Sequence, residues 1–372
     1  MPAGRLRVLD PHAAPLAQWH AHTAATGMDF LRSSIVHHID VDPYGLQHFA
    51  ASEAGRGVAR FARPYRRPSV ALFRAHAEAV VAREGLAALR LRGTARRLRR
   101  TAAGWALETD RGLLVARHVV LAPGPPPPHW PSWARPLRDA DAPVAHLFEP
   151  GFSREAIGAW ARAVVVGGGI SAAQAALALA QHRPGAVTLV MRHAPRIHDL
   201  DADPGWLGPK YLEGFHAEPC RVRRRQAIAA ARHRGSWPPA VHAAMQRAAA
   251  RGHLRCVQAA VREASWDGHA LRLTLASGEA LAADRLVLAT GFAPERPGGA
   301  LVARAVAELG LPVAPCGFPL LDPALRWQAG LFVTGGLAEL ELGPVARNIA
   351  GARMAATRLA AQVTRPAFAV AA

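Results

Sequence analysis

Cysteine is scarce in this sequence of 372 residues, with only Cys220, Cys256 and Cys316, which lie far apart and form no C-x-x-C pair. This distribution argues against a disulfide framework, a zinc site and a dithiol redox centre. A secretory signal is also missing, because the first ten residues carry Arg5 and Arg7 and have no apolar stretch. We therefore expect a soluble, cytoplasmic protein.

Uninterrupted hydrophobic runs of membrane-spanning length are missing as well. Residues 163–180 carry no charged side chain over 18 positions and could be mistaken for a membrane span. Three consecutive glycines interrupt this stretch, together with Ser171 and Gln174, and these residues fit a strand, a turn and a helix better. The sequence therefore predicts no membrane partner.

Lysine is almost absent, since Lys210 is the only one and arginine supplies nearly all of the positive charge. The formal net charge of +18 suggests a nucleic-acid partner. However, basic residues cluster only over residues 96–100 and 221–225, without the interleaved aromatic side chains that a nucleic-acid surface uses. We interpret the charge as an arginine-rich, solvated surface and expect no nucleic-acid partner.

The stretch that organises the chain begins at residues 164–166, a short β-branched run typical of a buried parallel strand. It ends in Gly167-x-Gly169-x-x-Ala172, and an Ala- and Leu-rich segment with high helical propensity follows over residues 173–180. A strand, a glycine turn and a helix in this order are the context of a dinucleotide-binding fingerprint. The glycines let the backbone approach a pyrophosphate, which then sits at the positive end of the helix. An ordinary tight turn is the alternative.

The next strand is predicted over residues 187–191, and it ends in Arg192 rather than in an acid. Near this position an Asp or Glu would hold the ribose hydroxyl of NAD, whereas an Arg accommodates the 2′-phosphate of NADP. Because Arg is abundant in this chain, the missing carboxylate between Val190 and Ala194 is the stronger half of the evidence. We favour NADP(H) over NAD(H).

An early strand is predicted from Arg5 to Asp10, and it is closed by an acid at the place where a dinucleotide-binding domain holds the adenosine ribose. The glycine loop that should precede this strand is absent. A βαβ unit needs about 30 residues, and only nine precede Asp10. Either Asp10 is a plain strand-end residue, or the chain begins in the middle of a dinucleotide-binding domain.

Residues 18–49, especially 28–44, are dense in His, Asp and aromatic side chains, and their irregular pattern predicts a long active-site loop region. His37 and His38 with two following aspartates suggest a metal site. On any regular backbone, however, adjacent histidines and alternating acids point in different directions, so we expect no metal there. Arg32 is the favoured contact for an anion or a flavin, with a plain surface arginine as the alternative.

Three alternating acids from Asp199 to Asp203 resemble the start of a calcium loop. The Gly and the distal Glu that such a loop requires do not follow at the right offsets. Residues 199–211 are better explained as an insertion that lines a pocket. Lys210 lies in this insertion and has a compact ammonium group that can shift its pKa, although chance survival of one lysine explains it equally well.

The remaining pattern predicts further helices and strands. Helices are expected over residues 67–84, 227–252 and 345–362. Strands are expected over residues 115–121, 254–257, 271–275, 286–292 and 330–336, with two or three more between residues 86 and 109.

These features resemble the flavoproteins with two dinucleotide-binding domains, and most closely the flavin-dependent monooxygenases that include the lysine and ornithine N-hydroxylases. The resemblance rests on the Gly167 motif, on Ala289-Thr290-Gly291-Phe292, on residues 330–336 with the helix that follows, and on the early strand ending at Asp10. It covers most of the chain. The Ala-Thr-Gly-Phe element is moderately specific for this superfamily, and the glycine motif alone is less so.

The resemblance implies an α/β fold with two Rossmann-like dinucleotide-binding domains. FAD would occupy a discontinuous domain made of residues 1–157 and 293–372, and NADP(H) would bind residues 158–292. Hydride would pass from the nicotinamide to the flavin, and oxygen would then hydroxylate a nucleophilic nitrogen or sulfur of a small substrate. Because the cofactors carry the difficult chemistry, no acid–base dyad is expected.

The same resemblance, with the motifs above, identifies candidate site residues. Those expected to bind cofactor are Asp10, Arg32, Gly167, Gly169, Ser171, Ala172, Arg192, Thr290, Gly291, Gly335 and Gly336. Those expected to line the substrate pocket are His38, Trp206 and Lys210. No catalytic side chain and no metal ligand are expected, and the sequence does not indicate the oligomeric state.

Two departures from the family pattern matter. The glycine fingerprint that cradles the FAD pyrophosphate has no counterpart, so the FAD-type domain would lack its first βα unit. Gly335-Gly336 stand where many relatives place an Asp toward the flavin ribityl chain. A start codon assigned too far downstream, a partner that supplies the missing part, and a remnant without FAD are three open explanations. A non-catalytic NADP(H)-binding relative and a flavin-linked reductase without oxygenation therefore stay open as alternatives.

Overall fold

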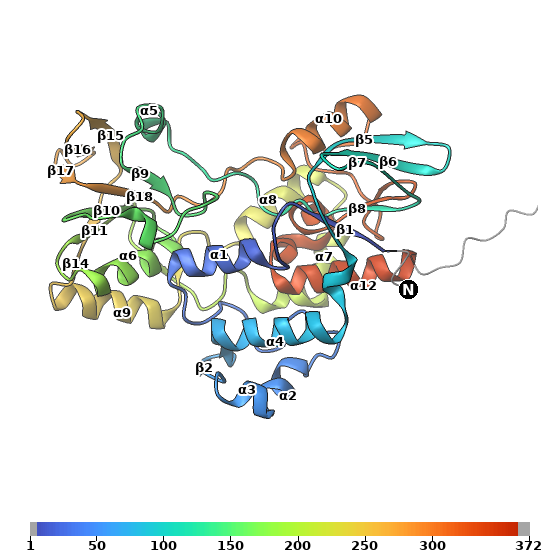
Figure 1. Cartoon of the computed structure of the whole chain (residues 1–372), viewed down its shortest axis with the longest axis horizontal. Helices are drawn as coiled ribbons and strands as arrows, with labels where there is room; N and C mark the ends of the chain where they lie inside the picture. Colours follow the sequence, from blue (N-terminus) through green and yellow to red (C-terminus); the bar gives the residue numbers. More distant parts are fainter. Residues whose placement is uncertain (1–5, 364–372) are drawn as a thin grey trace, which may run out of the picture.

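The computed structural model describes residues 6–363, and Figure 1 shows two lobes joined by crossing segments, with a group of helices below them. One lobe, the parallel-sheet lobe, is built on five parallel strands. Their order is β14 (Leu254–Gln258), β11 (Val187–Met191), β10 (Ala163–Val166), β18 (Arg285–Leu288) and β9 (Val144–His146). The strands predicted over residues 164–166, 187–191 and 254–257 are thereby confirmed.

Both faces of this sheet are covered, because successive strand residues point to opposite sides. Val165 packs with α6 (Ile170–His182) and α9 (Pro239–Ala250). Val164 packs on the opposite face. There it meets α5 (Arg135–Asp139) and an antiparallel sheet of β15 (Val261–Trp266), β16 (Leu271–Leu275) and β17 (Ala280–Ala283).

The second lobe contains two separate pairs of parallel strands. In the first pair β1 (Val8–Asp10) lies beside β4 (Arg90–Arg92), which confirms a strand ending at Asp10. In the second pair β8 (Val119–Leu121) lies beside β20 (Leu331–Val333), which also pairs with β19 (Arg326–Gln328). The two pairs belong to different sheets among the described residues. The lobe is completed by an antiparallel sheet of β5 (Ala95–Thr101), β6 (Gly104–Thr109) and β7 (Gly112–Ala116), and by α10 (Gly299–Leu309), α11 (Glu339–Leu342) and α12 (Ile349–Val363).

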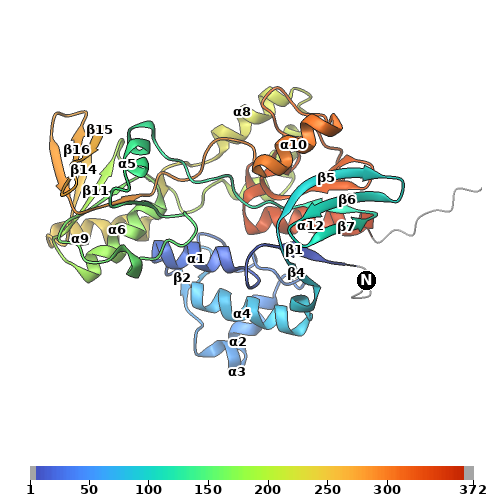
Figure 2. The same ribbon diagram turned by 45° about the horizontal axis from the view of Figure 1, so that its top comes forward.

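A helical group occupies the underside of the molecule (Figure 2). It consists of α1 (Ala17–Thr26), α2 (Gly45–Ala51), α3 (Glu53–Arg56) and α4 (Val70–Arg83), with the short strands β2 (Phe61–Ala62) and β3 (Arg67–Pro68). The helix predicted from residue 67 begins at Val70, because the Ser69 hydroxyl accepts a hydrogen bond from the Leu72 N–H and caps it.

An insertion after β11 leaves the parallel-sheet lobe. After the short strand β12 (Arg196–Ile197) and a 3₁₀ turn (Pro204–Leu207), it forms α7 (Pro209–Ala217) and α8 (Arg221–Ala231), and it returns through β13 (Ser236–Trp237). α7 and α8 lie with the C-terminal helices (Figure 1), and their apolar side chains Phe215 and Ile228 pack with Phe318 and Leu340. The fold of residues 199–231 thus connects the two lobes.

The predicted domain boundary between residues 157 and 158 does not coincide with a structural boundary. β9 and α5 both precede it, yet both belong to the parallel-sheet lobe. The chain passes from the second lobe to the parallel-sheet lobe nearer residues 123–130. There Pro128 and Phe292 form a β-bridge between two antiparallel segments that connect the lobes. Prediction from motifs alone missed this, because β9 carries no motif of its own.

Three predicted elements are corrected. The helix expected over residues 227–252 is interrupted by β13, since Gly235 has a left-handed φ of 70° and Pro238 follows. The strand expected over residues 115–121 is divided between β7 and β8, which pair with different partners. The helix expected from residue 345 begins at Ile349 after a 3₁₀ turn (Gly343–Arg347), and the Asn348 side chain caps it.

No helix in the described part of the chain is both long and apolar enough to cross a membrane.

Candidate functional site

The glycine turn after β10 is shaped by its closest neighbours. A Cβ atom at Gly167 would lie 2.3 Å from the carbonyl oxygen of Ala289, so only glycine fits between β10 and the end of β18. The Gly167 N–H donates to the Val190 carbonyl at 3.0 Å, which ties the turn to β11. Gly169 precedes α6, and a Cβ atom there would have no heavy atom within 4 Å. The N-terminal end of α6, where Ser171 and Ala172 lie, therefore opens beside free space, as an anion site requires.

Arg192 follows β11 directly and is exposed. Because β10 and β11 run parallel with Val166 opposite Val190, Arg192 emerges beside the glycine turn. His193 lies against the turn from the other side, since a Cβ atom at Gly168 would be 3.3 Å from its ring. The strand ends bring the turn and Arg192 to one edge of the sheet, while the contact with a 2′-phosphate stays a prediction.

Thr290 and Gly291 lie where the two connecting segments cross. The Thr290 hydroxyl donates to the His129 carbonyl, and His146 Nε2 lies 3.2 Å from the same hydroxyl oxygen. The Gly291 carbonyl accepts from the His129 N–H at 2.9 Å. His146 Nδ1 accepts from the Phe148 N–H, which leaves Nε2 as the donor to Thr290. The polar groups of Thr290 and Gly291 therefore hold the lobes' crossing segments together in this structure.

His146 makes the protein's stability depend on pH. Its side chain is fully buried, and burial lowers its pKa to about 4. In the unfolded chain the pKa is about 6.5, so the unfolded state binds the proton first as the pH falls from about 6.5 to about 4. Stability is therefore lost on acidification across this window, by up to about 3 kcal/mol for this group.

We expect His146→Gln to flatten the fall of the unfolding free energy between pH 6.5 and pH 4, measured by urea denaturation. Burial also lowers the pKa of His76 to about 4, so His76 likewise makes the unfolding free energy fall on acidification. The pH dependence of the unfolding free energy should therefore weaken in His146→Gln without vanishing. Replacing the exposed His12 by Gln serves as the control. An unchanged slope in His146→Gln would contradict the assignment.

The second glycine turn, Gly335-Gly336, follows β20. Gly335 has a left-handed φ of 62°, and a Cβ atom there would meet no heavy atom within 4 Å. Behind Gly336 stands Arg347, whose Nε donates to the buried carboxylate of Glu339 at 2.7 Å. Arg225 of α8 forms an ion pair with the same carboxylate. Arg225 thus links the insertion to Glu339, which also binds Arg347 beside the Gly336 turn.

A second buried ion pair anchors the insertion. Arg224 donates to the Glu341 carboxylate at 2.9 Å and to the carbonyl oxygens of His216, Glu218 and Leu340. Sequence reasoning missed Glu339 and Glu341, because Arg224 and Arg225 lie more than a hundred residues before them in the chain. Two acids in an otherwise apolar stretch were the available signal.

Arg32 fastens the insertion to the helical group. Its Nε donates to the Asp199 carbonyl at 3.1 Å, Nη2 to the His198 carbonyl at 2.7 Å, and Nη1 to the Ser236 carbonyl at 3.3 Å. Burial lowers the pKa of Arg32 to about 10, so it stays cationic at neutral pH. All three nitrogens donate within the protein, but Nη1 makes only one hydrogen bond and carries a second N–H. The predicted flavin or anion contact stays a prediction.

The candidate substrate residues do not gather at one place. Trp206 and Lys210 both lie against Tyr211, with the Trp206 ring centroid 5.4 Å and the exposed Lys210 Nζ 4.9 Å from the Tyr211 ring. His38 is fully buried elsewhere, with Nε2 3.1 Å from the Pro43 carbonyl and Nδ1 accepting from a backbone N–H, so it does not line a substrate pocket in this structure.

Leu207 of the insertion lies with Arg32 and Val345 at a small cavity of about 20 Å³. Since this volume holds about one water molecule, the pocket predicted along residues 199–211 stays a prediction.

Asp10 stands at the end of β1, where its carboxylate accepts from the His12 N–H at 2.8 Å. Asp10 and the Gly335 turn, both predicted to contact FAD, stand at the ends of β1 and β20 in the second lobe. The two elements predicted to hold NADP(H), the Gly167 turn and the N-terminal end of α6, are both formed in the parallel-sheet lobe. The described residues hold no group of three or more His, Cys, Asp or Glu that could bind a metal ion.

Comparison with known proteins agrees with this geometry. The family model described as L-lysine 6-monooxygenase/L-ornithine 5-monooxygenase matches residues 106–294, just over half of the chain. A search of the curated proteins found no significant match.

Solved structures share the fold. A cadaverine monooxygenase from Erwinia amylovora, solved with FAD, has a TM-score of 0.74 at 14% identity, over 98% of this chain and 92% of that one. The L-lysine 6-monooxygenase from Pseudomonas syringae has a TM-score of 0.72 at 19% identity, with the same two coverages. A Kutzneria ornithine N-hydroxylase, solved with reduced FAD, NADP⁺ and L-ornithine, has a TM-score of 0.71 at 16% identity, over 96% of this chain and 92% of that one.

The described residues form a mixed α/β fold that matches the fold of these flavin-dependent monooxygenases. The chain belongs to the L-lysine 6-monooxygenase/L-ornithine 5-monooxygenase family, whose members are FAD-dependent oxidoreductases. The resemblance noted in the sequence is confirmed.

Proposed function

We propose that this protein is an NADPH- and FAD-dependent monooxygenase that hydroxylates the amino group of a small amine. The family match supports the reaction class. The observation that carries the proposal is one insertion, residues 199–237, which contacts the first glycine turn and the short helix that follows the second. Trp237 Nε1 donates to the Gly168 carbonyl at 3.1 Å, and Arg225 forms an ion pair with Glu339 of α11.

In this proposal the residues of the chain bind and orient the cofactors, which supply hydride transfer and oxygen activation when bound. The Gly167 turn and the end of α6 would hold the NADP(H) pyrophosphate, and Arg192 its 2′-phosphate. The Gly335 turn would let the flavin approach the backbone closely. The insertion, held by Arg32 on one side and by Glu339 and Glu341 on the other, would exclude water between the lobes.

Domain roles follow from the same placement. The second lobe, with Asp10 and the Gly335 turn, is proposed as the FAD-type domain, discontinuous in sequence and without its first βα unit. The parallel-sheet lobe is proposed as the NADP(H)-type domain. Two strand pairs that belong to different sheets support the first assignment, because a Rossmann-like sheet is normally continuous.

The absorbance spectrum of the purified full chain tests the proposal. We expect a flavin band near 450 nm, about the usual position, which bleaches when NADPH is added without oxygen. Aerobic turnover with small aliphatic amines should then yield hydroxylamine in proportion to NADPH consumed. Peroxide without hydroxylamine would instead indicate a flavin-linked reductase. A colourless protein that binds NADPH would indicate the non-catalytic relative.

Arg192 is expected to determine coenzyme preference. Arg192→Asp should weaken NADPH binding at least about tenfold and leave NADH binding unchanged or improved, because a phosphate contact is lost and a ribose acceptor is gained. Fluorescence titration with both coenzymes measures this. Arg196→Asp, an exposed change on β12, serves as the matched control. Equal effects of the two substitutions would contradict the role of Arg192.

A further inference from the structure

The first glycine turn contains a peptide group that joins two glycines, Gly168 and Gly169. Because neither residue has a Cβ atom, this peptide plane can rotate with little steric resistance. Its orientation decides whether the Gly169 N–H or the Gly168 carbonyl oxygen faces outward from the turn. An outward N–H attracts an anion, whereas an outward carbonyl oxygen repels one. The turn therefore needs a contact that selects one orientation.

Trp237 of β13 makes this contact. Its Nε1 donates a hydrogen bond to the Gly168 carbonyl oxygen at 3.1 Å. In a planar trans peptide the carbonyl group and the following N–H point in opposite directions, so the Gly169 N–H points away from Trp237. Among the described residues none accepts a hydrogen bond from this N–H, and a Cβ atom at Gly169 would meet no heavy atom within 4 Å. The N–H is thus a free donor on the open side of the turn.

The indole of Trp237 is itself firmly held. Its side chain is 1% exposed and packs in the same core as Ala172 of α6. The Trp237 carbonyl accepts from the His198 N–H at 3.0 Å, and Arg32 Nη1 donates to the neighbouring Ser236 carbonyl at 3.3 Å. An indole offers one donor and no acceptor. A reversed peptide would bring the Gly169 N–H against it and leave both donors without an acceptor, so the indole selects one orientation.

We propose that Trp237 is a positioning residue for the coenzyme, because it presets the Gly169 N–H as a donor to a pyrophosphate oxygen of NADP(H). The indole is buried, so it acts through the peptide that it orients and not by touching the coenzyme. This inference rests on the proposed role of the Gly167 turn. It extends that role, because it makes the returning strand of the insertion part of the coenzyme site.

Trp105 of β6 provides an internal comparison. Its side chain is also 1% exposed, and its Nε1 donates to the Ala329 carbonyl oxygen at 3.0 Å. The two indoles therefore make the same kind of buried hydrogen bond. Only the bond of Trp237 reaches the glycine turn, whereas that of Trp105 lies in the second lobe.

Isothermal titration calorimetry of the purified full chain tests the proposal, with NADPH and with adenosine 2′-monophosphate, which lacks the pyrophosphate. We expect Trp237→Phe to weaken NADPH binding by about fivefold or more, because the bond that orients the donor is lost. Binding of adenosine 2′-monophosphate should stay unchanged, since its phosphate is proposed to contact Arg192. Trp105→Phe is the matched control and should change neither affinity.

A second variant separates packing from hydrogen bonding, because phenylalanine also leaves a cavity at position 237. The amino acid 3-benzothienylalanine has the shape of tryptophan, with a sulfur atom in place of the indole N–H. In place of Trp237 it should fill the core as tryptophan does and preserve the fold. It should still weaken NADPH binding as much as Trp237→Phe, since it too lacks the donor.

Three results would overturn the positioning role. The first is NADPH binding that 3-benzothienylalanine in place of Trp237 leaves unchanged. The second is equal weakening of NADPH binding in Trp105→Phe, which would indicate general destabilisation. The third is equal weakening of NADPH and adenosine 2′-monophosphate binding in the Trp237 variants, which would show that the indole holds the whole turn in place and does not act through one peptide.

The titrations also distinguish this inference from the proposed reaction. Hydroxylation plays no part in them, so a protein that binds NADPH without hydroxylating an amine contradicts the proposed reaction and not the role of Trp237. An unmodified protein that binds no NADPH overturns both.

Discussion

Gly167→Ala should abolish NADPH binding and destabilise the parallel-sheet lobe by about 3 kcal/mol, the upper end of the usual cost of overpacking. The new methyl group would stand 2.3 Å from the Ala289 carbonyl oxygen, and both partners are backbone. Neither β10 nor β18 can yield easily, because each is hydrogen-bonded to a parallel neighbour on both sides. The turn would be displaced from the end of α6, where the coenzyme phosphates are proposed to bind.

Gly169→Ala provides the contrast, because a methyl group there meets no heavy atom of the protein. The backbone at Gly169 is extended, with φ of −92°, so alanine is tolerated. We expect unchanged stability but NADPH binding at least about tenfold weaker, since the methyl group occupies space needed by the pyrophosphate. Urea denaturation and NADPH fluorescence titration separate the two effects.

Gly214→Ala in α7 controls for glycine replacement in general. This position is inside a helix with open space around it, so alanine should be neutral or stabilising by up to about 1 kcal/mol. If Gly169→Ala bound NADPH as tightly as the unmodified protein, the glycine turn would not be the pyrophosphate site.

Glu339→Gln should lower the unfolding free energy by about 3 kcal/mol, because it leaves two arginines facing each other without their shared acid. The Glu339 side chain is 2% exposed, and those of Arg225 and Arg347 are each 24% exposed. Partial solvation of the arginines keeps the expected cost at the lower end of the range for buried pairs. The same change should loosen the insertion from the Gly335 turn.

Glu308→Gln is the matched control, since Glu308 also pairs with an arginine distant in sequence, Arg97, but at the surface. Its cost should not exceed about 1 kcal/mol. Combining Arg225→Met with Glu339→Gln should cost less than the sum of the two single changes, because the second removes a partner already lost. Equal costs for Glu339→Gln and Glu308→Gln in urea denaturation would show that the buried cluster adds nothing to stability.

Local sequence patterns predicted the parts of the fold whose backbone conformation depends on neighbouring residues. The β-branched run before Gly167, the glycine spacing and the helical segment after it predicted β10, the turn and α6 correctly. The acid at Asp10 and the arginine at Arg192 marked strand ends, because a strand stops where polar side chains must leave the core. These motifs sufficed for the family.

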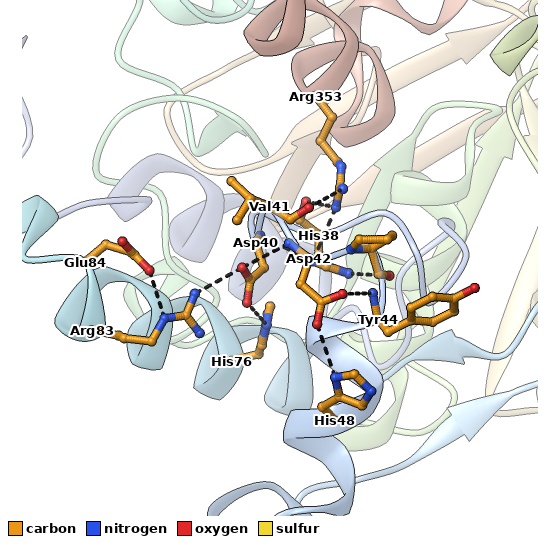
Figure 3. Close-up of polar contacts among 11 residues, drawn as sticks. His38, Asp40, Val41, Asp42, Tyr44, His48, His76, Arg83, Glu84 and Arg353 are labelled. Carbon is orange, nitrogen blue, oxygen red and sulfur yellow. Dashed lines mark hydrogen bonds and ion pairs between the residues drawn. The ribbon is translucent and has the colours of Figure 1, made fainter. Parts of the chain in front are cut away.

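Tertiary structure decided what long-range contacts determine. β9 joins the parallel-sheet lobe because it pairs with β18, and no local sequence pattern in residues 144–146 predicts this pairing. Residues 209–231 form α7 and α8, and only their packing against Phe318 and Leu340 assigns them to the second lobe. The surroundings of a histidine are also set by the fold: the His38 side chain is fully buried with two hydrogen bonds (Figure 3), whereas the buried ring of His76 in α4 has no hydrogen-bond partner. Sequence spacing specifies backbone shape over a few residues, and only the folded chain specifies which charges and hydrogen-bonding groups meet across two hundred.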